Sequence, residues 1–481
     1  MNATELRNSQ GAQTFSRFVL IKKFWKILLI QSVVAISVSG IMLNMLGISN
    51  IIWPGENFHS FELGIIVSLK MLMVACMGIV FGYFTDRMSR KTLFSIVLFI
   101  MGIGKFLNGY VPLFDSNFAF ILFIIWYALL GIGQGGIDPL ILSYSNDSCE
   151  SEIRSRFFGI NEVFRQFFLL VGMILSAWLI QTGNWRIYFW STGLTLIITS
   201  IFIFFTLDEP KRGIMRHELK WILSKNINYK YKLNKSTIKS TIFSKTNIIA
   251  FIEGIFTWVL FSIAVYLIYP YIQSPPYNVS PVVSSLLMII FGVPGSIIGA
   301  ITFAKLSDKL AEKNPNNRIY LIVSSLVILF CVIILLFIIP LPPLNIEEAN
   351  NISNLLMYPI FIIFGILLFV LRAVLGVYNI NQSPLLQIIN LPEAQGTISA
   401  WNQFLEKFGY GLGPLISGYL LTLTNQNYVQ TALFSLFLGF PSILLWLLAI
   451  KWLHSDIKRI NEIMEIRAKE LKNEKMENKT N

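Results

Sequence analysis

Long apolar runs, separated by short polar segments, follow one another along almost the whole chain. Twelve of them reach about 20 residues or more, which is the length that an α-helix needs to cross a hydrocarbon layer of about 30 Å. The runs are residues 27–49, 60–84, 92–110, 118–145, 157–182, 186–207, 247–271, 281–304, 319–340, 353–380, 396–423 and 429–451. This pattern predicts an all-α membrane protein with twelve transmembrane helices.

The longest polar interruption, residues 208–246, separates six runs from six. We therefore expect an N-terminal six-helix bundle over 27–207, a cytoplasmic linker over 208–246 and a C-terminal six-helix bundle over 247–451. Residues 1–26 are the cytoplasmic N-terminus in this prediction. Residues 452–481 mix Lys, Arg and Glu at helical spacing, which predicts a charged cytoplasmic C-terminal helix that can contact anionic lipid headgroups.

Composition and charge support the membrane class. Of the 481 residues, 54% are hydrophobic and 13% are charged, whereas soluble proteins average about 25% charged residues. The formal net charge is +12, but the lysines and arginines gather in alternate interhelical loops, and only Arg186 departs from this pattern. By the positive-inside rule this alternation predicts cytoplasmic termini, and it argues against nucleic acid as a partner. We therefore predict a multi-pass protein of the cell membrane.

A charged motif follows the second apolar run, and a weaker copy follows the second run of the other half. The first copy contains, in order, Gly82, Asp86, Arg87, Arg90 and Lys91. The second copy, residues 304–313, keeps Asp308 but has lost the glycine and the final Arg-Lys pair. Equivalent motifs in two halves indicate a duplicated membrane bundle, which is typical of solute transporters.

Twelve spans, cytoplasmic termini, a central linker and this motif after span two together resemble the major facilitator superfamily. The resemblance implies a monomer of two six-helix bundles, each built from 3+3 inverted repeats. It also implies that the motif joins helix ends on the cytoplasmic side, with Asp86 bound to a neighbouring helix end and Arg90 to an acidic partner such as Asp147. Faint features around residues 131–139 resemble the spinster branch, but Gln134 stands where that branch has an acidic residue, and the subfamily stays open.

Polar and ionisable side chains inside the predicted spans are the candidate substrate-binding or gating residues, because a charge at the centre of a membrane costs about 2.5–3.5 kcal/mol. They are Lys70, Gln134, Asp138, Glu162, Arg165, Glu253, Arg372, Asn379 and Glu406. Lys70 and Glu406 both lie near the predicted midplane, on spans two and eleven, which face each other in the family fold. We predict that they pair across the pathway; the alternative is an ion pair that only fills the bundle. Of Glu406 and Lys407, only one is expected to face a cavity, because adjacent helix positions point about 100° apart.

The other candidates have more local interpretations. Glu162 and Arg165 are three residues apart on one helical face and can neutralise each other. Asp138 precedes a proline that is expected to break its helix beside a cavity. Glu253 lies near the cytoplasmic end of its span and can extend toward water there. Arg372 has no acidic neighbour in sequence, which suits a carboxylate, phosphate or sulfate group on a substrate.

The predicted function is that of a secondary transporter that moves a small organic or amphiphilic solute by alternating access, with H+ as a candidate coupling ion. The alternative is a non-transporting membrane sensor or a lipid-handling protein on a transporter fold. We expect no enzyme, no cofactor and no metal, because the three histidines lie in loops or at a span end and no catalytic triad or nucleotide-binding loop is present. The expected partners are the solute and membrane lipids.

Overall fold

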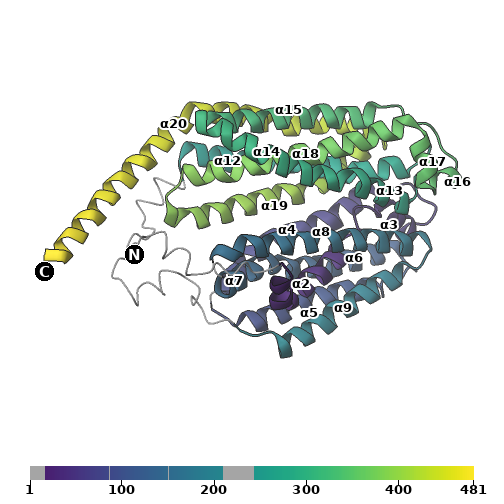
Figure 1. The fold of residues 1–481 in the computed structure, drawn as a ribbon. Coiled ribbons are helices and arrows are strands. Elements are labelled where there is room, and N and C mark those ends of the chain that lie inside the picture. The colour runs from purple at the N-terminus through teal and green to yellow at the C-terminus, as the bar shows by residue number, and fades with distance from the viewer. Residues whose placement is uncertain (1–16, 86, 150, 210–242, 481) are drawn as a thin grey trace.

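The computed structural model describes residues 17–85, 87–149, 151–209 and 243–480, and within these ranges all regular structure is helical. Asp86, the residues before 17 and most of the predicted linker lie outside the described residues. The helices form two bundles that lie one below the other in Figure 1. The lower bundle, coloured purple to blue, is the N-half, and the upper one, coloured green to yellow, is the C-half.

The N-half contains the elements that correspond to the first six predicted spans. They are α2 (Arg17–Val38), α3 (Met45–Ile52), α4 (Ser60–Thr85), α5 (Arg90–Asn108), α6 (Ser116–Gly135), α7 (Ile137–Ser148), α8 (Ser151–Gln181) and α9 (Trp185–Thr206). Within this half α2 packs along α8, α5 along α9, and α6 along both α4 and α5.

The C-half contains the remaining spans and the short helices of its connecting loops. Its elements are α12 (Lys245–Gln273), α13 (Pro281–Leu287), a π-helical turn (Met288–Gly292), α14 (Val293–Lys313), α15 (Asn316–Ile338), α16 (Ile346–Ala349), α17 (Ile352–Met357), α18 (Pro359–Ile388), α19 (Pro392–Leu423) and α20 (Tyr428–Thr480). Here α12 packs along α19 and α20, and α18 packs along α14 and α15.

Ten helical stretches in the described ranges are long and apolar enough to cross a membrane. Two further long helices, α2 and α19, are not among these ten: α2 contains a cluster of lysines, and α19 contains Glu406 and Lys407 near its middle. Both nevertheless pack inside the bundles, α2 against α8 and α19 against α4 and α12. The fold is therefore an all-helical bundle with many apolar spans.

The first predicted span is interrupted by a turn. Residues 39–44 separate α2 from α3, and Gly40 in this turn has φ +93°, a conformation that favours glycine. A Cβ on Gly40 would lie 2.0 Å from the hydroxyl oxygen of Ser176 on α8, so the glycine also permits a close approach. The side-chain amide of Asn44 donates to the Gly40 carbonyl (2.7 Å) and to the Ser176 hydroxyl (3.1 Å). The prediction of one continuous helix over 27–49 is therefore wrong.

The fourth predicted span is also divided, at Gly136 between α6 and α7. Pro139 lies in the first turn of α7 and has no N–H with which to continue the helical ladder of α6. The break places Asp138 at the start of α7, where side chains of the two halves approach each other. This agrees with the helix interruption that the sequence predicts at this proline.

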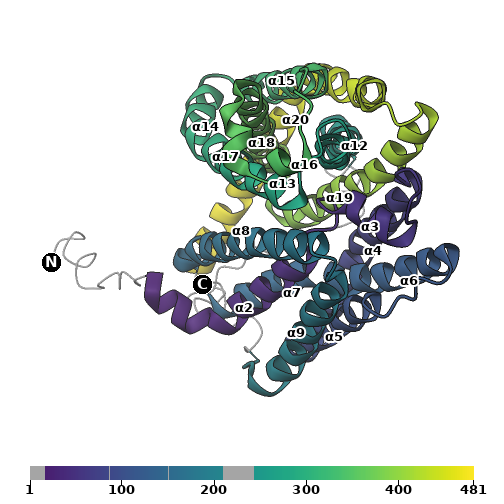
Figure 2. The same ribbon diagram turned by 90° about the vertical axis from the view of Figure 1, so that its right-hand side faces the viewer.

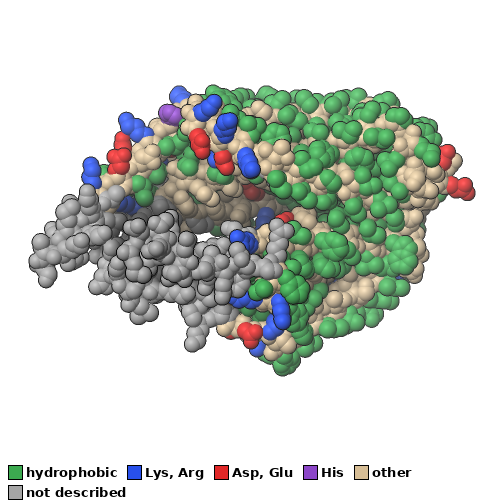
Figure 3. Space-filling view, in the orientation of Figure 1, with side chains coloured by type: hydrophobic (Ala, Val, Ile, Leu, Met, Phe, Trp, Pro, Cys, Tyr) green, Lys and Arg blue, Asp and Glu red, His purple; other side chains and the backbone are tan. Residues whose placement is uncertain are grey.

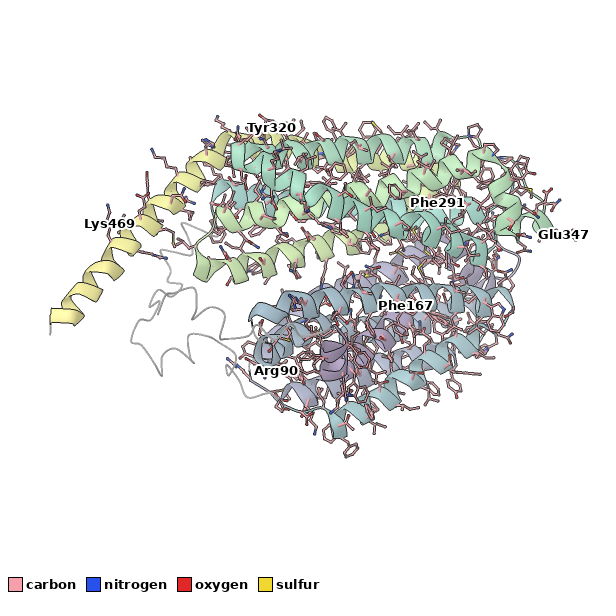
Figure 4. All side chains as sticks on the ribbon, viewed as in Figure 1. Arg90, Phe167, Phe291, Tyr320, Glu347 and Lys469 are labelled. Carbon is pink, nitrogen blue, oxygen red and sulfur yellow. The ribbon has the colours of Figure 1, made fainter. Side chains whose placement is uncertain are left out.

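The two ends of the molecule differ in how the halves meet. We call the end that carries Arg90, from which the last part of α20 projects, the terminal end. We call the opposite end, which carries Glu347, the far end (Figures 1 and 4). At the far end, toward the viewer in Figure 2, α3 contacts α12 and α8 contacts α13. Hydrogen bonds between the halves at this end join Gln273 to Leu43, Gln426 to Phe58 and Gln181 to Asn350.

The most extensive contact between the halves is that of α4 with α19. A Cβ on Gly64 would lie 2.5 Å from the Pro414 carbonyl oxygen, and one on Gly418 would lie 2.3 Å from the Ser60 carbonyl oxygen. The Ser60 hydroxyl donates to the Gly418 carbonyl at 3.1 Å and lies 3.2 Å from the Thr422 hydroxyl. Small residues thus allow the two backbones to touch, as they do at many helix interfaces in membranes.

This closed far end predicts a cross-link. Because the hydroxyl oxygens of Ser60 and Thr422 are 3.2 Å apart, two sulfur atoms at these positions come within bonding reach. In a protein lacking its natural cysteines, the double variant Ser60→Cys/Thr422→Cys should form a disulfide under mild oxidation, as measured by mass spectrometry of the joined peptides. The two single variants are the controls. A double variant that stays fully reduced would contradict a closed far end.

Candidate functional site

Two connected cavities lie between the halves. The central cavity has a volume of about 490 Å³, and an adjoining cavity of about 610 Å³ continues toward the terminal end. The two share Val74, Asp138, Gln403 and Lys407 in their walls. Figure 3 shows a hollow between the halves that opens toward the terminal end. The space is thus accessible from that end, whereas the contacts of α4 with α19 close it at the far end.

An ion pair bridges the halves within this space. Lys407 Nζ on α19 lies 2.8 Å from Asp138 Oδ2 on α7, at the helix break described above. Both side chains remain partly exposed, at 38% for Lys407 and 65% for Asp138. A water-exposed pair of this kind is worth at most about 1 kcal/mol, so it can be exchanged for another partner at little cost.

Glu406 and Lys407 both line the central cavity, so the expectation that only one of them would is wrong. The two side chains point to different helices: Lys407 reaches Asp138 on α7, and Glu406 packs against α12. A Cβ on Gly254 of α12 would lie 3.2 Å from Glu406 Cγ, and Glu406 accepts a hydrogen bond of 2.7 Å from Asn402. Adjacent side chains project about 100° apart around the axis of α19, but the cavity extends along both of these directions. Both side chains therefore face it.

Glu162 and Arg165 form the local pair that the sequence predicts. Arg165 Nε and Nη2 donate to the two carboxylate oxygens of Glu162 at 2.7 and 2.5 Å. Arg165 also lines the central cavity, beside Gln134. The side-chain oxygen of Gln134 is buried and has no hydrogen-bond partner among the described residues. Arg165 therefore adds a cationic group, and Gln134 an unused acceptor, to the wall formed by the N-half.

Aromatic side chains form the opposite wall. Trp258 on α12 and Tyr410 on α19 line the central cavity with ring centroids 6.0 Å apart, and Phe261 packs against both. Arg372 on α18 lies behind this cluster, with its guanidinium 5.5 Å from the Phe261 ring centroid. No ion pair of Arg372 is found within the described ranges, but the residue lies outside the walls of the two cavities and does not face them as the sequence interpretation supposed. Asn379, on the same helix, is exposed and also lies outside those walls.

The predicted ion pair between Lys70 and Glu406 is not formed. Lys70 is 1% exposed and its ammonium points into the N-half, 5.9 Å from the ring centroid of Tyr127. Lys105 approaches the same ring at 5.9 Å and the Tyr188 ring at 4.2 Å. The depth of Lys70 in the membrane stays a prediction, whereas the face of α4 from which it was expected to project is wrong. A cation near an aromatic face has a favourable electrostatic partner without a carboxylate.

Glu253 does not extend to water, contrary to the sequence interpretation. It is 0% exposed, inside the C-half, and accepts hydrogen bonds from the hydroxyl groups of Thr257 and of Tyr378. Gln382 in turn donates to the Tyr378 hydroxyl at 2.9 Å. Neighbouring helices cover this position completely, although it lies only about two turns from the start of α12.

The charged motif after α4 forms a network within the N-half. The guanidinium of Arg90 pairs with Asp147 at the end of α7, as predicted, and its Nε donates to Ser143 at 2.8 Å. Arg90 Nη1 lies 3.4 Å from Glu209, which follows α9. The Arg90 side chain is only 4% exposed, so this cluster ties three helix ends together in a mostly buried setting.

Glu209 is the acceptor in this network that the sequence analysis missed. Its carboxylate accepts hydrogen bonds from the Ser89 hydroxyl (2.7 Å) and from the backbone N–H groups of Arg90 (3.1 Å) and Lys91 (2.9 Å). Partial burial by itself raises the pKa of Glu209, but the hydrogen bonds from Lys91, Ser89 and Arg90 outweigh it and hold the pKa below its ordinary value. The N-terminus of α5 is thereby capped by an acid from the segment that follows α9.

The remaining motif residues are placed as follows. Gly82 lines the terminal-side cavity, Arg87 stacks on Tyr83 at 3.8 Å, and Lys91 lies 5.7 Å from the Phe204 ring centroid. In the second copy Asp308 pairs with Arg318 at 2.8 Å, so this copy also holds two helices together. Asp86 itself lies outside the described residues.

Among the polar and aromatic residues of the central cavity, sequence reasoning missed Gln31, Gln403 and Tyr410. Gln403 and Tyr410 lie within two turns of Glu406 on α19, so the signal was the helix itself. Its glycines and charges interrupt an otherwise apolar run, and that pattern is expected where a membrane helix faces a cavity rather than lipid.

The Arg90 network predicts an ordered series of stabilities. Arg90→Ala removes the cation that pairs with both Asp147 and Glu209, whereas Asp147→Asn removes one acid and keeps the pair of Arg90 with Glu209; removing one partner of a buried pair costs about 3–5 kcal/mol. The thermal unfolding midpoint of the purified protein should therefore fall most for Arg90→Ala, less for Asp147→Asn and hardly at all for Glu462→Gln, whose pair with Lys458 is exposed. Equal midpoints for all three variants would contradict this network.

Comparison with known proteins places this geometry in a family. The sequence profile of the Major Facilitator Superfamily matches residues 32–404. The niacin transporter NiaP of Acinetobacter baylyi is 25% identical over 276 residues, which cover 52% of this chain and 60% of NiaP. The 4-hydroxybenzoate transporter PcaK of the same organism is 26% identical over 159 residues, which cover 32% of each chain. The chain thus spans less than two thirds of the length of these curated relatives.

Solved structures share the fold. A bacterial homologue of the human lysosomal transporter Spinster, in an inward-facing and occupied conformation, superposes with a TM-score of 0.65. It is 16% identical in sequence, and the match covers 93% of this chain and 99% of that one. The profile match, the two helical halves and the cavity between them lead to one conclusion: this chain belongs to the major facilitator superfamily and is a multi-pass membrane transport protein rather than an enzyme.

Proposed function

We propose that this chain is a secondary transporter that carries a small aromatic organic anion across the cell membrane by alternating access. Twelve helical spans cross the membrane in this proposal, the ten apolar stretches together with α2 and α19. The observation that carries the proposal is the pair of Lys407 and Asp138, which bridges the two halves inside a water-accessible cavity. A ligand that takes over one member of this pair acts on both halves at once.

The orientation in the membrane rests on charge. Basic side chains gather at the terminal end, among them Lys309 and Arg318, whereas the far end carries Glu56, Glu347 and Glu348. The positive-inside rule then assigns the terminal end, and with it both chain termini, to the cytoplasm. With this orientation, the cavity that opens at the terminal end corresponds to an inward-open state of the carrier.

The cavity chemistry favours an anion with a flat ring. Lys407 can exchange the carboxylate of Asp138 for that of a ligand at little cost, because their pair is exposed to water. Arg165 supplies a second cation on the facing wall, and Trp258 with Tyr410 supplies aromatic surface for a ring. A volume of about 490 Å³ lies in the range of small-molecule sites.

The relatives point to the same class of solute. NiaP and PcaK are, by name, transporters of niacin and of 4-hydroxybenzoate, and each of these solutes is an aromatic ring that bears a carboxylate. We therefore take nicotinate and 4-hydroxybenzoate as the first probes for this chain. The role of Arg372, which lies behind the aromatic wall, remains a prediction: it can add long-range attraction for an anion.

Two variants should change nicotinate transport in opposite directions. Lys407→Ala removes the cation that pairs with the solute carboxylate; an exposed pair is worth up to about 1 kcal/mol, so counterflow of radiolabelled nicotinate in proteoliposomes should fall by about fivefold. Asp138→Asn removes the competing carboxylate, so the apparent affinity for nicotinate should rise, by about fivefold at most for a pair worth up to about 1 kcal/mol.

Lys458→Ala is the matched control, because this lysine is 79% exposed on the projecting part of α20. Wild-type counterflow in Lys407→Ala would contradict the assigned anion site. Nicotinate binding measured by calorimetry without any counterflow would favour the second class of function, a sensor or lipid-handling protein built on the same fold.

A further inference from the structure

The C-half contains an acidic group that the proposed anion site does not use. Glu253 on α12 is 0% exposed, and both of its carboxyl oxygens have hydroxyl partners: Oε1 meets Thr257, and Oε2 meets Tyr378 at 2.9 Å. Thr257 and Tyr378 are themselves fully buried. The carboxyl group is therefore sealed from lipid and from bulk water, and both of its oxygens are hydrogen-bonded.

The hydrogen bonds around Glu253 suit two protonation states. The Gln382 amide donates to the Tyr378 hydroxyl at 2.9 Å, so the Tyr378 hydroxyl proton is left to point at Glu253 Oε2. The Thr257 hydroxyl can either donate to Oε1 or accept from it, because a hydroxyl does both. A proton can thus be added to Oε1 or removed from it without the loss of a hydrogen bond.

Only neutral donors stabilise the ionised form of Glu253. Within the described ranges no lysine, arginine or histidine lies within ion-pair distance of its carboxylate, and a buried, uncompensated charge costs several kcal/mol. The indole N–H of the fully buried Trp446 on α20 approaches the same carboxyl group, yet it has no hydrogen-bond partner of normal geometry in the described structure. The site therefore holds a neutral carboxylic acid more readily than a carboxylate.

A second acid connects this site to the cavity. Glu406 lines the central cavity, and it packs against Gly254, the neighbour of Glu253 on α12, where a Cβ would lie 3.2 Å from Glu406 Cγ. The two carboxyl groups are close enough to interact electrostatically. Gln382 approaches the Glu406 carboxyl group and also donates to the Tyr378 hydroxyl, which is bonded to Glu253. Two neighbouring carboxyl groups with no cation between them favour a state in which one of them holds a proton.

The titratable groups that face Glu253 are few. From α18 it is faced by Tyr378 and from α19 by Glu406, while α20 presents the non-titratable Trp446. The helices α3 and α13, which also contact α12, contain no titratable residue. Lys407, next to Glu406, is directed to Asp138 across the cavity.

We propose that Glu253 is a proton-binding site that is loaded from the central cavity through Glu406, and that its protonation couples solute movement to a proton gradient. In the loading step a proton leaves hydronium in the cavity water for the Glu406 carboxylate. The O–H bond on Glu406 then breaks as one forms on Glu253 Oε1, and unloading runs the same steps in reverse. The coupling part of this inference rests on the proposed transport function; the proton site itself does not.

Infrared difference spectroscopy of the purified full-length protein tests the site without any substrate. Near neutral pH the wild-type protein should show the C=O band of a protonated carboxylic acid, and Glu253→Gln should lose that band while keeping the wild-type elution volume in size exclusion. Glu347→Gln, at an exposed position of the far end (Figure 4), is the control and should retain it. An unchanged band in Glu253→Gln would overturn the proton site.

Proteoliposomes test the coupling, with nicotinate as the probe. With a proton gradient imposed, wild-type protein should accumulate nicotinate, whereas Glu253→Gln should keep counterflow without a gradient and lose the gradient response. A gradient response that is absent in the wild-type protein, equal in the two proteins, or replaced by a response to sodium would overturn the coupling. If even wild-type counterflow is absent, the proposed anion transport fails, and the infrared result alone decides the proton site.

Discussion

The close contact of α4 with α19 is the interaction on which the arrangement of the two halves depends. Glycines at 64 and 418 bring the two backbones together near the far end, where a side chain would meet a carbonyl oxygen at 2.5 or 2.3 Å. Because the halves touch there, the space between them widens toward the terminal end, and both cavities lie in that space. Contact at one end and separation at the other is the geometry that rocking of two rigid halves requires.

Charges in this apolar molecule are accommodated in three ways. Arg90 is buried against two acids and holds helix ends together. Lys407 and Asp138 are paired in a water-accessible cavity, where their bond is weak enough to be exchanged. Glu253 is buried among hydroxyl groups, with no cationic partner in the described part of the chain, which suits a group that gains and loses a proton. The first arrangement favours stability, and the other two favour exchange with a solute or a proton.

The sequence predicted the class of fold because a membrane imposes strong rules on length and charge. Periodic apolar runs located nearly all the long helices, and the motif led to the Arg90–Asp147 pair. The rules fail where the face of a helix decides the outcome. Lys70 lies near the middle of α4 but turns toward Tyr127, and Glu253 is covered by helices that are distant in sequence. The expected depth of a residue in the membrane follows from counting residues along its span. The neighbour that its side chain faces depends on helix packing, which one sequence does not specify.

The most direct test of a rocking carrier is a pair of distances measured by pulsed electron paramagnetic resonance. One pair of spin labels, at Arg156 and Lys309, reports on the terminal end, and another, at Phe114 and Ile346, reports on the far end; all four positions are exposed. Addition of nicotinate should shorten the first distance and lengthen the second, because the halves pivot about the contact of α4 with α19. Distances that both stay fixed, or that increase together, would contradict this account of the protein.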